Sequence, residues 1–471
     1  MKTEPYEHQR LAFEKIKDKN YYAIFMDTGL GKTWLAIAYC ELILANSEFA
    51  LVICPKTLIK NWANEITKHS NKLQVITELK KPDNNKPGVV ILNYEFFRNP
   101  DKVDKLLQTF SEFKIVIADE ASMIKNPKAQ QSEGAIFMSQ LAKYRLILTA
   151  TPTTQAIDDI FNLFKFLDHG KTFGTNYYKF KRKYFENIQD KNPRLKFPIW
   201  VPKKGAIKEI LEKIEPYTIK YTKSEVLNLP PKIYSQSYIE LSPQQIEVYN
   251  KLAQEDILAM KGNEEIIIST QIAKLAKYKQ ITSGFYYMPD ENKVVEFKEN
   301  PKLEELKFLV NKFILENKKI LIWTTLKYER KLIYNELVKY FKQPILILDP
   351  DLDDEQRFDI VDKFNKSKPP VILLAALKIA KYGLNIFADN VIFYSNDFSF
   401  ESRYQAEDRA YRIGTKGSVL YYDLIADGFI DSNIQKIINN KLDIHKHVMG
   451  FKSLIYVQPE DMTKQPSYEN T

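Results

Sequence analysis

The chain has 471 residues, of which 44% are hydrophobic and 27% charged, values that suit two or three folded domains. No apolar run reaches the roughly 20 residues of a membrane span, the N-terminus is too polar for a signal peptide, and two cysteines provide no disulfide framework, so we expect a cytoplasmic protein with no targeting signal. The net charge is +9, and its position in the chain is more informative than its size.

The first 150 residues alternate short apolar runs with helical patterns. Runs such as 115–118 and 146–148 are apolar at consecutive positions, which is typical of strands covered on both faces. The sequence therefore predicts an α/β fold with a doubly wound parallel sheet. The expected strands are residues 21–26, 49–54, 88–93, 113–118 and 144–148.

A glycine-rich segment connects the first of these strands to a predicted helix at residues 34–44. Glycines there let backbone N–H groups wrap phosphates at the helix N-terminus, which is typical of a phosphate-binding loop. Lys32 is expected to reach the β- and γ-phosphates of a nucleotide, and the Thr33 hydroxyl to ligate Mg²⁺. The loop residues expected to hold the nucleotide are Thr28, Gly29, Gly31, Lys32 and Thr33.

Two carboxylates, Asp119 and Glu120, end the apolar strand predicted before them. In this position one carboxylate can hold Mg²⁺ while its neighbour orients the attacking water. Thr149 and Thr151 follow the next strand, at the edge where open α/β sheets bind their ligands. A Thr-Pro turn leaving the sheet would explain these two threonines equally well.

Residues 169–300 differ in character from the segments on either side. They contain clustered prolines and helical patterns at 242–261 and 264–280, so we expect helical protrusions and a linker rather than a third sheet. Between Lys171 and Ser224 there are 14 Lys and Arg against 5 Asp and Glu, whereas the rest of the chain balances at 55 against 55. A basic face interleaved with aromatic residues suits a polyanion such as nucleic acid. The alternative is an ordinary solvated surface.

A second series of apolar runs follows residue 300 and predicts a second α/β domain. Its expected strands are residues 319–323, 344–348, 371–375, 390–394 and 419–424. We therefore expect an N-terminal nucleotide-binding lobe at 1–168, basic protrusions and a linker at 169–300, a C-terminal lobe at 301–458 and a disordered polar tail at 459–471.

Arg409 and Arg412 are three residues apart on a predicted helix and so share one face. Their permanently charged guanidinium groups suit the charge that develops on a phosphoryl group during transfer. The alternative is a surface helix in which they pair with Glu407 and Asp408. The phosphate loop in the same chain favours the first interpretation, in which two distant segments complete one nucleotide site.

Taken in order, these segments resemble the Swi/Snf family of helicase-like ATPases in helicase superfamily two, which translocate along double-stranded DNA. The resemblance extends from about Tyr6 to Ile437, and its most specific part is residues 405–414. Ser122 stands where the family usually has histidine. The resemblance implies two RecA-like lobes with helical insertions between them, in a minimal bacterial or phage-type form.

The resemblance also implies roles for individual residues. Those in nucleotide-contacting positions are Gln9, Gly383 and Asn385. Those in segments that couple the nucleotide to movement are Thr149, Thr151 and Gln405. Those in nucleic-acid-contacting positions are Lys56, Thr57, Asn93, Tyr94, Trp323 and Thr324.

The expected function is an ATP-dependent motor on DNA, mainly duplex DNA, with ATP and Mg²⁺ as cofactors and Lys32, Asp119, Glu120, Arg409 and Arg412 as catalytic residues. Two alternatives stay open. One is a strand-separating helicase that acts on forked DNA or on substrates containing RNA. The other is a nucleotide-gated DNA clamp with negligible turnover.

Overall fold

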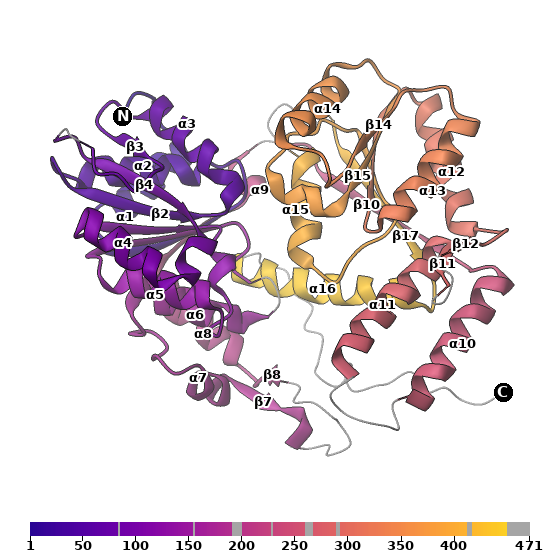
Figure 1. The fold of residues 1–471 in the computed structure, drawn as a ribbon, viewed down its shortest axis with the longest axis horizontal. Helices are drawn as coiled ribbons and strands as arrows, with labels where there is room; N and C mark the ends of the chain where they lie inside the picture. The colour runs from indigo at the N-terminus through magenta and orange to yellow at the C-terminus, as the bar shows by residue number, and fades with distance from the viewer. Residues whose placement is uncertain are drawn as a thin grey trace. The chain divides into compact units, whose positions relative to one another are not determined.

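The structure is a computed structural model, and it describes residues 1–82, 85–153, 156–190, 200–227, 229–259, 267–288, 293–411 and 417–449. The chain divides into two compact units (Figure 1). Unit 1 comprises Met1–Leu227 together with Lys441–Thr471, and unit 2 comprises Asn228–Asn440. The predicted middle segment, 169–300, therefore contributes to both units. The predicted polar tail lies outside the described residues.

Unit 1 is built on a seven-stranded sheet in the order β3-β4-β2-β5-β6-β1-β9. All of its strand pairs are parallel. The central strands are buried along almost their whole length, because helices cover both faces of the sheet. The strands are β1 (Tyr21–Met26), β2 (Phe49–Cys54), β3 (Gln74–Ile76), β4 (Gly88–Asn93), β5 (Ile115–Asp119), β6 (Tyr144–Thr149) and β9 (Thr218–Tyr221).

The helices of unit 1 pack in two layers, each with its own apolar core. One core lies under α1, α2 and α3 and includes Ile24, Val52 and Ile117 from the sheet. The other lies under α4, α5, α6 and α8 and includes Phe25 and Ile53, the neighbours that point to the opposite face. The helices are α1 (Glu7–Ile16), α2 (Lys32–Ile43), α3 (Ile59–His69), α4 (Pro100–Phe110), α5 (Gln130–Gln140), α6 (Ile160–Asp168), α7 (Tyr177–Tyr184), α8 (Ala206–Ile214) and α9 (Lys223–Val226).

Unit 2 repeats this construction with a six-stranded sheet in the order β10-β17-β16-β13-β15-β14. Its strand pairs are also parallel. The strands are β10 (Lys232–Ile239), β13 (Lys319–Thr324), β14 (Ile345–Leu348), β15 (Val371–Ala376), β16 (Asn390–Phe393) and β17 (Val419–Ala426). The two sheets confirm the predicted α/β class.

Helices also cover both faces of the second sheet. Leu321 and Leu373 belong to the core under α14 and α15, and Ile320 and Ile322 to the core under α12 and α13. The helices are α10 (Pro243–Ala259), α11 (Ile267–Ser283), α12 (Pro301–Leu315), α13 (Lys327–Tyr340), α14 (Asp354–Lys366), α15 (Phe400–Ala410) and α16 (Ile430–Met449). Residues 441–449 of α16 belong to unit 1.

The expectation that residues 169–300 would add helices but no sheet was wrong in part. The edge strands β9 and β10 come from this segment, as do two small antiparallel sheets. These pair β7 (Phe185–Asn187) with β8 (Trp200–Pro202), and β11 (Phe285–Tyr287) with β12 (Val294–Glu296). The strands escaped prediction because they are short or half-exposed, as β10 is at the sheet edge, and so lack a continuous apolar run.

Candidate nucleotide site

The predicted phosphate loop lies between the carboxyl end of β1 and the first turn of α2. Gly29 and Gly31 both have a φ of +82°, a left-handed conformation that glycine adopts without strain. Gly31 is the N-cap of α2, so the free N–H groups of the first helical turn follow directly. A Cβ atom at Gly31 would lie 1.9 Å from Gln9 Nε2. The loop thus has the backbone geometry and the donors of a phosphate site.

Lys32 is 9% exposed, and its ammonium group folds back over the loop. Lys32 Nζ donates to Met26 O at 2.8 Å and to Asp27 O at 3.4 Å. Lys32 is the first residue of α2, and an ammonium group there binds a phosphate more strongly than it binds neutral carbonyl groups. Thr33 is the next residue of α2 and is half-buried.

The acidic pair stands at the carboxyl end of β5, as predicted. Asp119 is 6% exposed, and its carboxylate accepts from Trp62 Nε1 at 2.7 Å and from Glu120 N at 2.9 Å. Burial raises the pKa of Asp119, while the hydrogen bond from Trp62 and the charge of Lys32 oppose that rise. The phosphate loop follows β1 and the acidic pair follows β5, so both lie at the carboxyl edge of the same parallel sheet.

Glu120 has a left-handed backbone, with φ +47° and ψ 54°. A residue with a Cβ atom adopts this conformation at a cost of about 1–2 kcal/mol, and such strain is concentrated at functional sites. The side chain of Glu120 is half-buried and follows the buried Asp119 directly. The turn therefore places two consecutive carboxylates at the end of one strand.

Thr149 ends β6, the neighbour of β5, and Thr151 follows two residues later. Both side chains are buried, and Thr149 Oγ1 accepts from Thr151 N at 3.0 Å. Within the described part of the chain, Thr151 Oγ1 has no hydrogen-bond partner. A buried hydroxyl without a partner at the ligand edge of the sheet fits a group that receives its partner from a ligand or a nearby loop.

Residues at the start of α1 contact the phosphate loop through Leu30. Gln9 is 4% exposed, and its Nε2 donates to Leu30 O at 3.3 Å while its Oε1 accepts from Tyr6 N at 2.9 Å. His8 Nε2 lies 2.9 Å from the same Leu30 oxygen. Tyr6 is 67% exposed and stacks on His8 with ring centroids 5.9 Å apart. Gln9 thus lies next to the loop, as its predicted role in nucleotide recognition requires.

Sequence reasoning missed Lys223, which links α9 to the loop. Lys223 N donates to Asp27 Oδ2 at 2.8 Å, and Lys223 Nζ to Thr28 Oγ1 at 3.5 Å. Asp27 N in turn donates to Tyr221 O at 3.1 Å. A segment nearly 200 residues away in the sequence therefore holds the first residues of the loop. The bond between Trp62 and Asp119 was also missed, because no spacing in the sequence indicates it.

In unit 2, Arg409 lies on α15 and is 5% exposed. Ile386 N donates to Arg409 O at 3.1 Å, and a Cβ atom at Gly383 would lie 3.8 Å from Arg409 Nη1. Gly383 itself has a φ of +78°. The segment that carries Gly383 and Asn385 thus packs beside Arg409, and the role of these residues at a nucleotide site stays a prediction. Arg412 lies outside the described residues.

Gln405 is half-buried on the same helix, and its Nε2 donates to Glu401 Oε1 at 3.3 Å. Glu407, by contrast, serves an ion cluster. It accepts from Lys232 at 3.2 Å, from Tyr234 at 2.7 Å and from Arg403 at 2.8 Å. Burial alone would lower the pKa of Lys232, but Glu407 and other nearby groups raise it well above its usual value. The Glu407 carboxylate thus binds two side chains of β10 and one of its own helix.

The six residues predicted to contact nucleic acid fall into two groups, three at least partly exposed and three buried. Lys56 and Thr57 are exposed on the 3-10 turn after β2, and Asn93 is half-exposed at the end of β4. Tyr94, Trp323 and Thr324 are fully buried. Tyr94 donates to Asp119 O at 2.7 Å, and Thr324 Oγ1 donates to Ala375 O at 3.0 Å. We therefore correct the prediction for these three side chains, because each is enclosed by the protein and offers no surface to nucleic acid.

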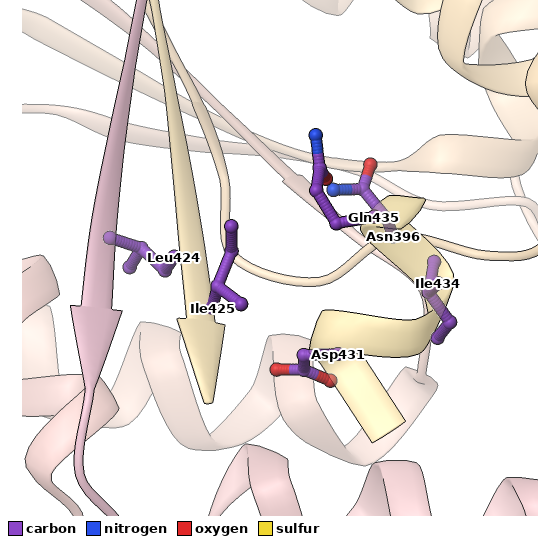
Figure 2. Close-up of a pocket in the computed structure, with 6 residues that line it drawn as sticks. All are labelled: Asn396, Leu424, Ile425, Asp431, Ile434 and Gln435. Atoms are coloured by element: carbon purple, nitrogen blue, oxygen red, sulfur yellow. The ribbon is translucent and has the colours of Figure 1, made fainter. Parts of the chain in front are cut away.

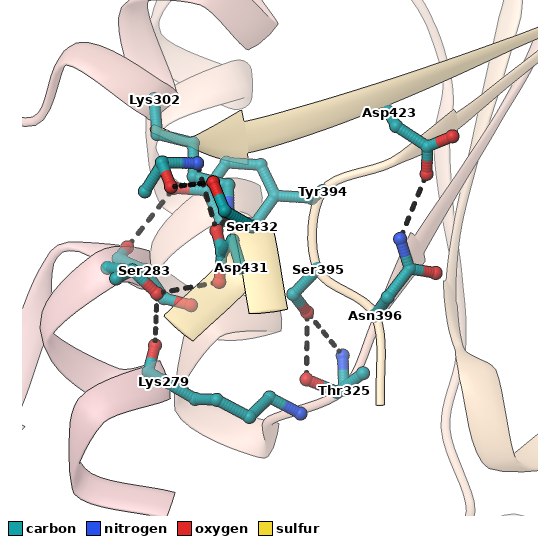
Figure 3. A network of polar contacts seen from close by, with 12 residues as sticks. Lys279, Ser283, Lys302, Thr325, Tyr394, Ser395, Asn396, Asp423, Asp431 and Ser432 are labelled. Carbon is teal, nitrogen blue, oxygen red and sulfur yellow. Dashed lines mark hydrogen bonds and ion pairs between the residues drawn. The ribbon is translucent and has the colours of Figure 1, made fainter. Parts of the chain in front are cut away.

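A second polar cluster lies in unit 2, near the carboxyl ends of β13, β16 and β17 (Figure 3). Asp431 at the start of α16 forms an ion pair with Lys302 and accepts from Thr282 at 3.0 Å. Ser283 and Ser395 both donate to Glu329 at 2.6 Å. These groups satisfy one another, so the cluster fixes the helix ends rather than awaiting a ligand.

Beside this cluster is a small cavity of about 10 Å³, which is the space of one water molecule (Figure 2). It is too small for a nucleotide and belongs to the packing of α16 against the sheet. It is lined by Asn396, Leu424, Ile425, Asp431, Ile434 and Gln435.

Across the described residues, no three or more His, Cys, Asp or Glu side chains gather into a metal site. Mg²⁺ keeps several water or phosphate ligands and needs only one or two from the protein, so Thr33 and Asp119 fit it as donors. The site therefore has the features of a phosphate-loop nucleotide hydrolase.

Within the described residues, no helix combines the length and apolar character that crossing a membrane requires.

Comparison with known proteins agrees with this class. Residues 14–283 match the SNF2-related domain and residues 301–414 the helicase conserved C-terminal domain. The first match covers more than half of the chain. The chain therefore belongs to the SNF2-related family of helicase-like ATPases, which confirms the resemblance inferred from the motifs.

Similar curated proteins include the uncharacterized ATP-dependent helicase MG018 of Mycoplasma genitalium, 24% identical over 93% of this chain and 42% of the relative. The putative ATP-dependent helicase/translocase YwqA of Bacillus subtilis is also 24% identical, over 91% of this chain and 46% of the relative. The chain thus spans less than half the length of these two relatives. Among solved structures, the Sulfolobus solfataricus SWI2/SNF2 ATPase core in complex with dsDNA is 24% identical, with a TM-score of 0.44 and coverage of 95% of this chain and 93% of that one.

Proposed function

We propose that the chain hydrolyses ATP and uses the energy to move along duplex DNA. The observation that carries this proposal is the position of the phosphate-loop cation, Lys32, and the buried carboxylate of Asp119, which follow β1 and β5 at the carboxyl edge of one parallel sheet. Membership in the SNF2-related family supports the coupling of that site to DNA.

Each polar group then has a role in the reaction. Lys32 and the N–H groups of the loop bind the β- and γ-phosphates, and Gln9 recognises the adenine base. Glu120 orients the attacking water, and Arg409 and Arg412 stabilise the charge that develops on the phosphoryl group. Thr33 and Asp119 hold Mg²⁺, which neutralises phosphate charge when it is bound.

The deciding measurement is steady-state ATP hydrolysis with duplex DNA, single-stranded DNA, forked DNA and RNA. We expect duplex DNA to stimulate turnover most, and the protein to displace the third strand of a DNA triplex. Faster unwinding of forks than triplex displacement would instead identify a strand-separating helicase. Negligible turnover on every nucleic acid would identify a nucleotide-gated clamp.

The first mutational prediction is that Lys32→Ala abolishes DNA-stimulated hydrolysis, because the variant lacks the cation that holds the β- and γ-phosphates. Residual turnover should fall at least a hundredfold, while circular dichroism and the melting temperature stay close to those of the wild type. Lys102→Ala, which removes an exposed lysine from α4, is the matched control and should keep full activity. Wild-type turnover by Lys32→Ala would show that the site has been assigned wrongly.

A further inference from the structure

In the basic segment that begins at Lys171, only some of the positive side chains are left without a partner, because others form ion pairs within unit 1. On α7, Lys181 forms an ion pair with Asp158, and Tyr177 donates to the same carboxylate at 2.7 Å. Lys181 also lies over the ring of Phe185, 4.5 Å from its centroid. One face of α7 is thus fastened to the rest of unit 1.

The charges on α8 and at the end of α7 form a second group. Lys183 and Lys213 lie 3.3 Å and 3.8 Å from Glu209, and Lys208 lies 3.8 Å from Glu212. These lysines are balanced by carboxylates of the same surface. They contribute little to the excess positive charge that we first noted in the sequence.

The opposite face of α7 keeps its charge. Lys179 and Arg182 are exposed there, three residues apart, so they lie on the same side of the helix. Within the ranges that the structure describes, neither side chain has an ion-pair or hydrogen-bond partner, and α7 itself contains no acidic residue. Tyr178, 60% exposed, stands beside them.

A third cation joins this face from a different part of the chain. Lys128 Nζ lies 5.7 Å from the centroid of the Tyr178 ring. Lys128 is exposed in the loop between the 3-10 turn Ala121–Ile124 and α5. That turn directly follows Asp119 and Glu120. The α7 face, which we define as Lys128, Tyr178, Lys179 and Arg182, thus adjoins the segment that follows the acidic pair.

We propose that the α7 face binds the phosphate backbone of duplex DNA, as a contact additional to those near the nucleotide site. This inference rests on the proposed function, since DNA is the polyanion on which the motor would act. Lys, Arg and Tyr side chains are the groups that position a protein on phosphate oxygens, and the absence of acid on α7 removes the repulsion that such a contact would meet.

The test compares duplex DNA binding by the wild type and by Lys179→Gln/Arg182→Gln at several salt concentrations. Loss of two phosphate contacts should reduce the slope of log K against log salt by about 1.8. The concentration of duplex DNA that half-stimulates the ATPase should rise in parallel. The matched control is Lys102→Gln/Lys105→Gln on α4, where two exposed lysines have the same spacing, and it should keep the wild-type slope.

The outcomes separate this inference from the proposed function. If duplex DNA neither binds to nor stimulates the wild type, the proposed function fails. If it does both and the double variant keeps the wild-type slope, only the α7 face is overturned. Retention of that slope together with lost binding to polyglutamate would show that the face binds an acidic polypeptide instead. If the double variant folds poorly, the two single variants provide the same test, each with an expected reduction of about 0.9.

Discussion

Gly29 and Gly31 share a left-handed backbone but differ in their surroundings. A Cβ atom at Gly29 would meet no atom within 4 Å, whereas one at Gly31 would displace the amide of Gln9. Both alanine variants should therefore incur the backbone cost of about 1–2 kcal/mol, but only Gly31→Ala should disturb adenine recognition. We expect Gly31→Ala to reduce the preference for ATP over GTP, and Gly29→Ala to leave it unchanged, as measured by nucleotide titration. Equal loss of preference in the two variants would contradict this assignment of Gln9.

Trp62 is a positioning residue for Asp119. Trp62→Phe keeps an aromatic ring but removes the N–H that donates to the carboxylate at 2.7 Å. Because a hydrogen bond to a charged group contributes about 1.5–3 kcal/mol, kcat should fall roughly tenfold or more. The concentration of Mg²⁺ needed for half-maximal activity should rise as well, which a merely structural defect would not produce.

The control for this prediction is Trp34→Phe. Trp34 Nε1 donates to Thr3 Oγ1 at 3.2 Å, away from the acidic pair, so this variant also loses one indole hydrogen bond. Its kcat and Mg²⁺ requirement should match those of the wild type. If the two variants lose activity equally, Trp62 has no special relation to the reaction.

Most residues of the candidate site could be predicted from sequence, because glycine spacing and the position of polar residues after apolar strands are local signals. Lys32, Asp119 and Gly31 are all found at the ends of the predicted strands and helix. Trp62, Lys223 and His8 could not be predicted in their roles, because their hydrogen bonds depend on which distant elements converge. Burial of Tyr94 and Trp323 was missed for the same reason, since a motif position gives no information on packing around it.

At the scale of elements, the fold was predictable wherever strands are covered on both faces. β1, β2 and β4 begin and end at the predicted residues, because their apolar runs are continuous. β9 and β10 have no such run, because each lies at the edge of its sheet and has a half-exposed side. Pairing with β1 and β17, respectively, rather than any pattern of their own, determines that they are strands.

β10 is joined to α15 by an ion cluster, which makes Lys232 important to unit 2. Lys232→Met leaves Glu407 and Asp408 with less compensating charge in a buried environment. We expect the free energy of unfolding of this unit to fall by roughly 3 kcal/mol in urea denaturation. Lys251→Met removes an exposed pair with Glu247 and should leave stability unchanged.

The pH dependence of that loss has a definite sign. Burial alone would raise the pKa of Glu407, but the charges of Lys232 and Arg403 hold it below its usual value. A carboxylate with a lowered pKa stabilises the fold above the pKa of the unfolded state, about 4.3, and this stabilisation is lost as the pH falls further. The difference between wild type and Lys232→Met should therefore be largest above about pH 5 and should shrink below about pH 4. A difference that is constant between pH 3 and pH 7 would show that the ionised pair is not its source.

At the scale of the whole molecule, the two units have separate apolar cores. Such a chain is expected to unfold in more than one step. Trp323 is the single tryptophan of unit 2, since the other three are Trp34, Trp62 and Trp200. The difference in fluorescence between wild type and Trp323→Phe should report a urea transition with a midpoint distinct from that of the remaining tryptophans. A single coincident transition for all four would indicate one cooperative unit.

The left-handed backbone at Glu120 affects which residue would be selected at this position in laboratory evolution. Glycine would occupy that position without penalty, so selection for thermal robustness alone would favour replacing the glutamate. If Glu120 orients the attacking water, as proposed, a variant library screened only for heat resistance should accumulate inactive molecules at this codon, whereas a screen for turnover should retain the acid and its conformational cost. With the proposed role of Glu120, robustness and catalysis make opposite demands on a single residue of this chain.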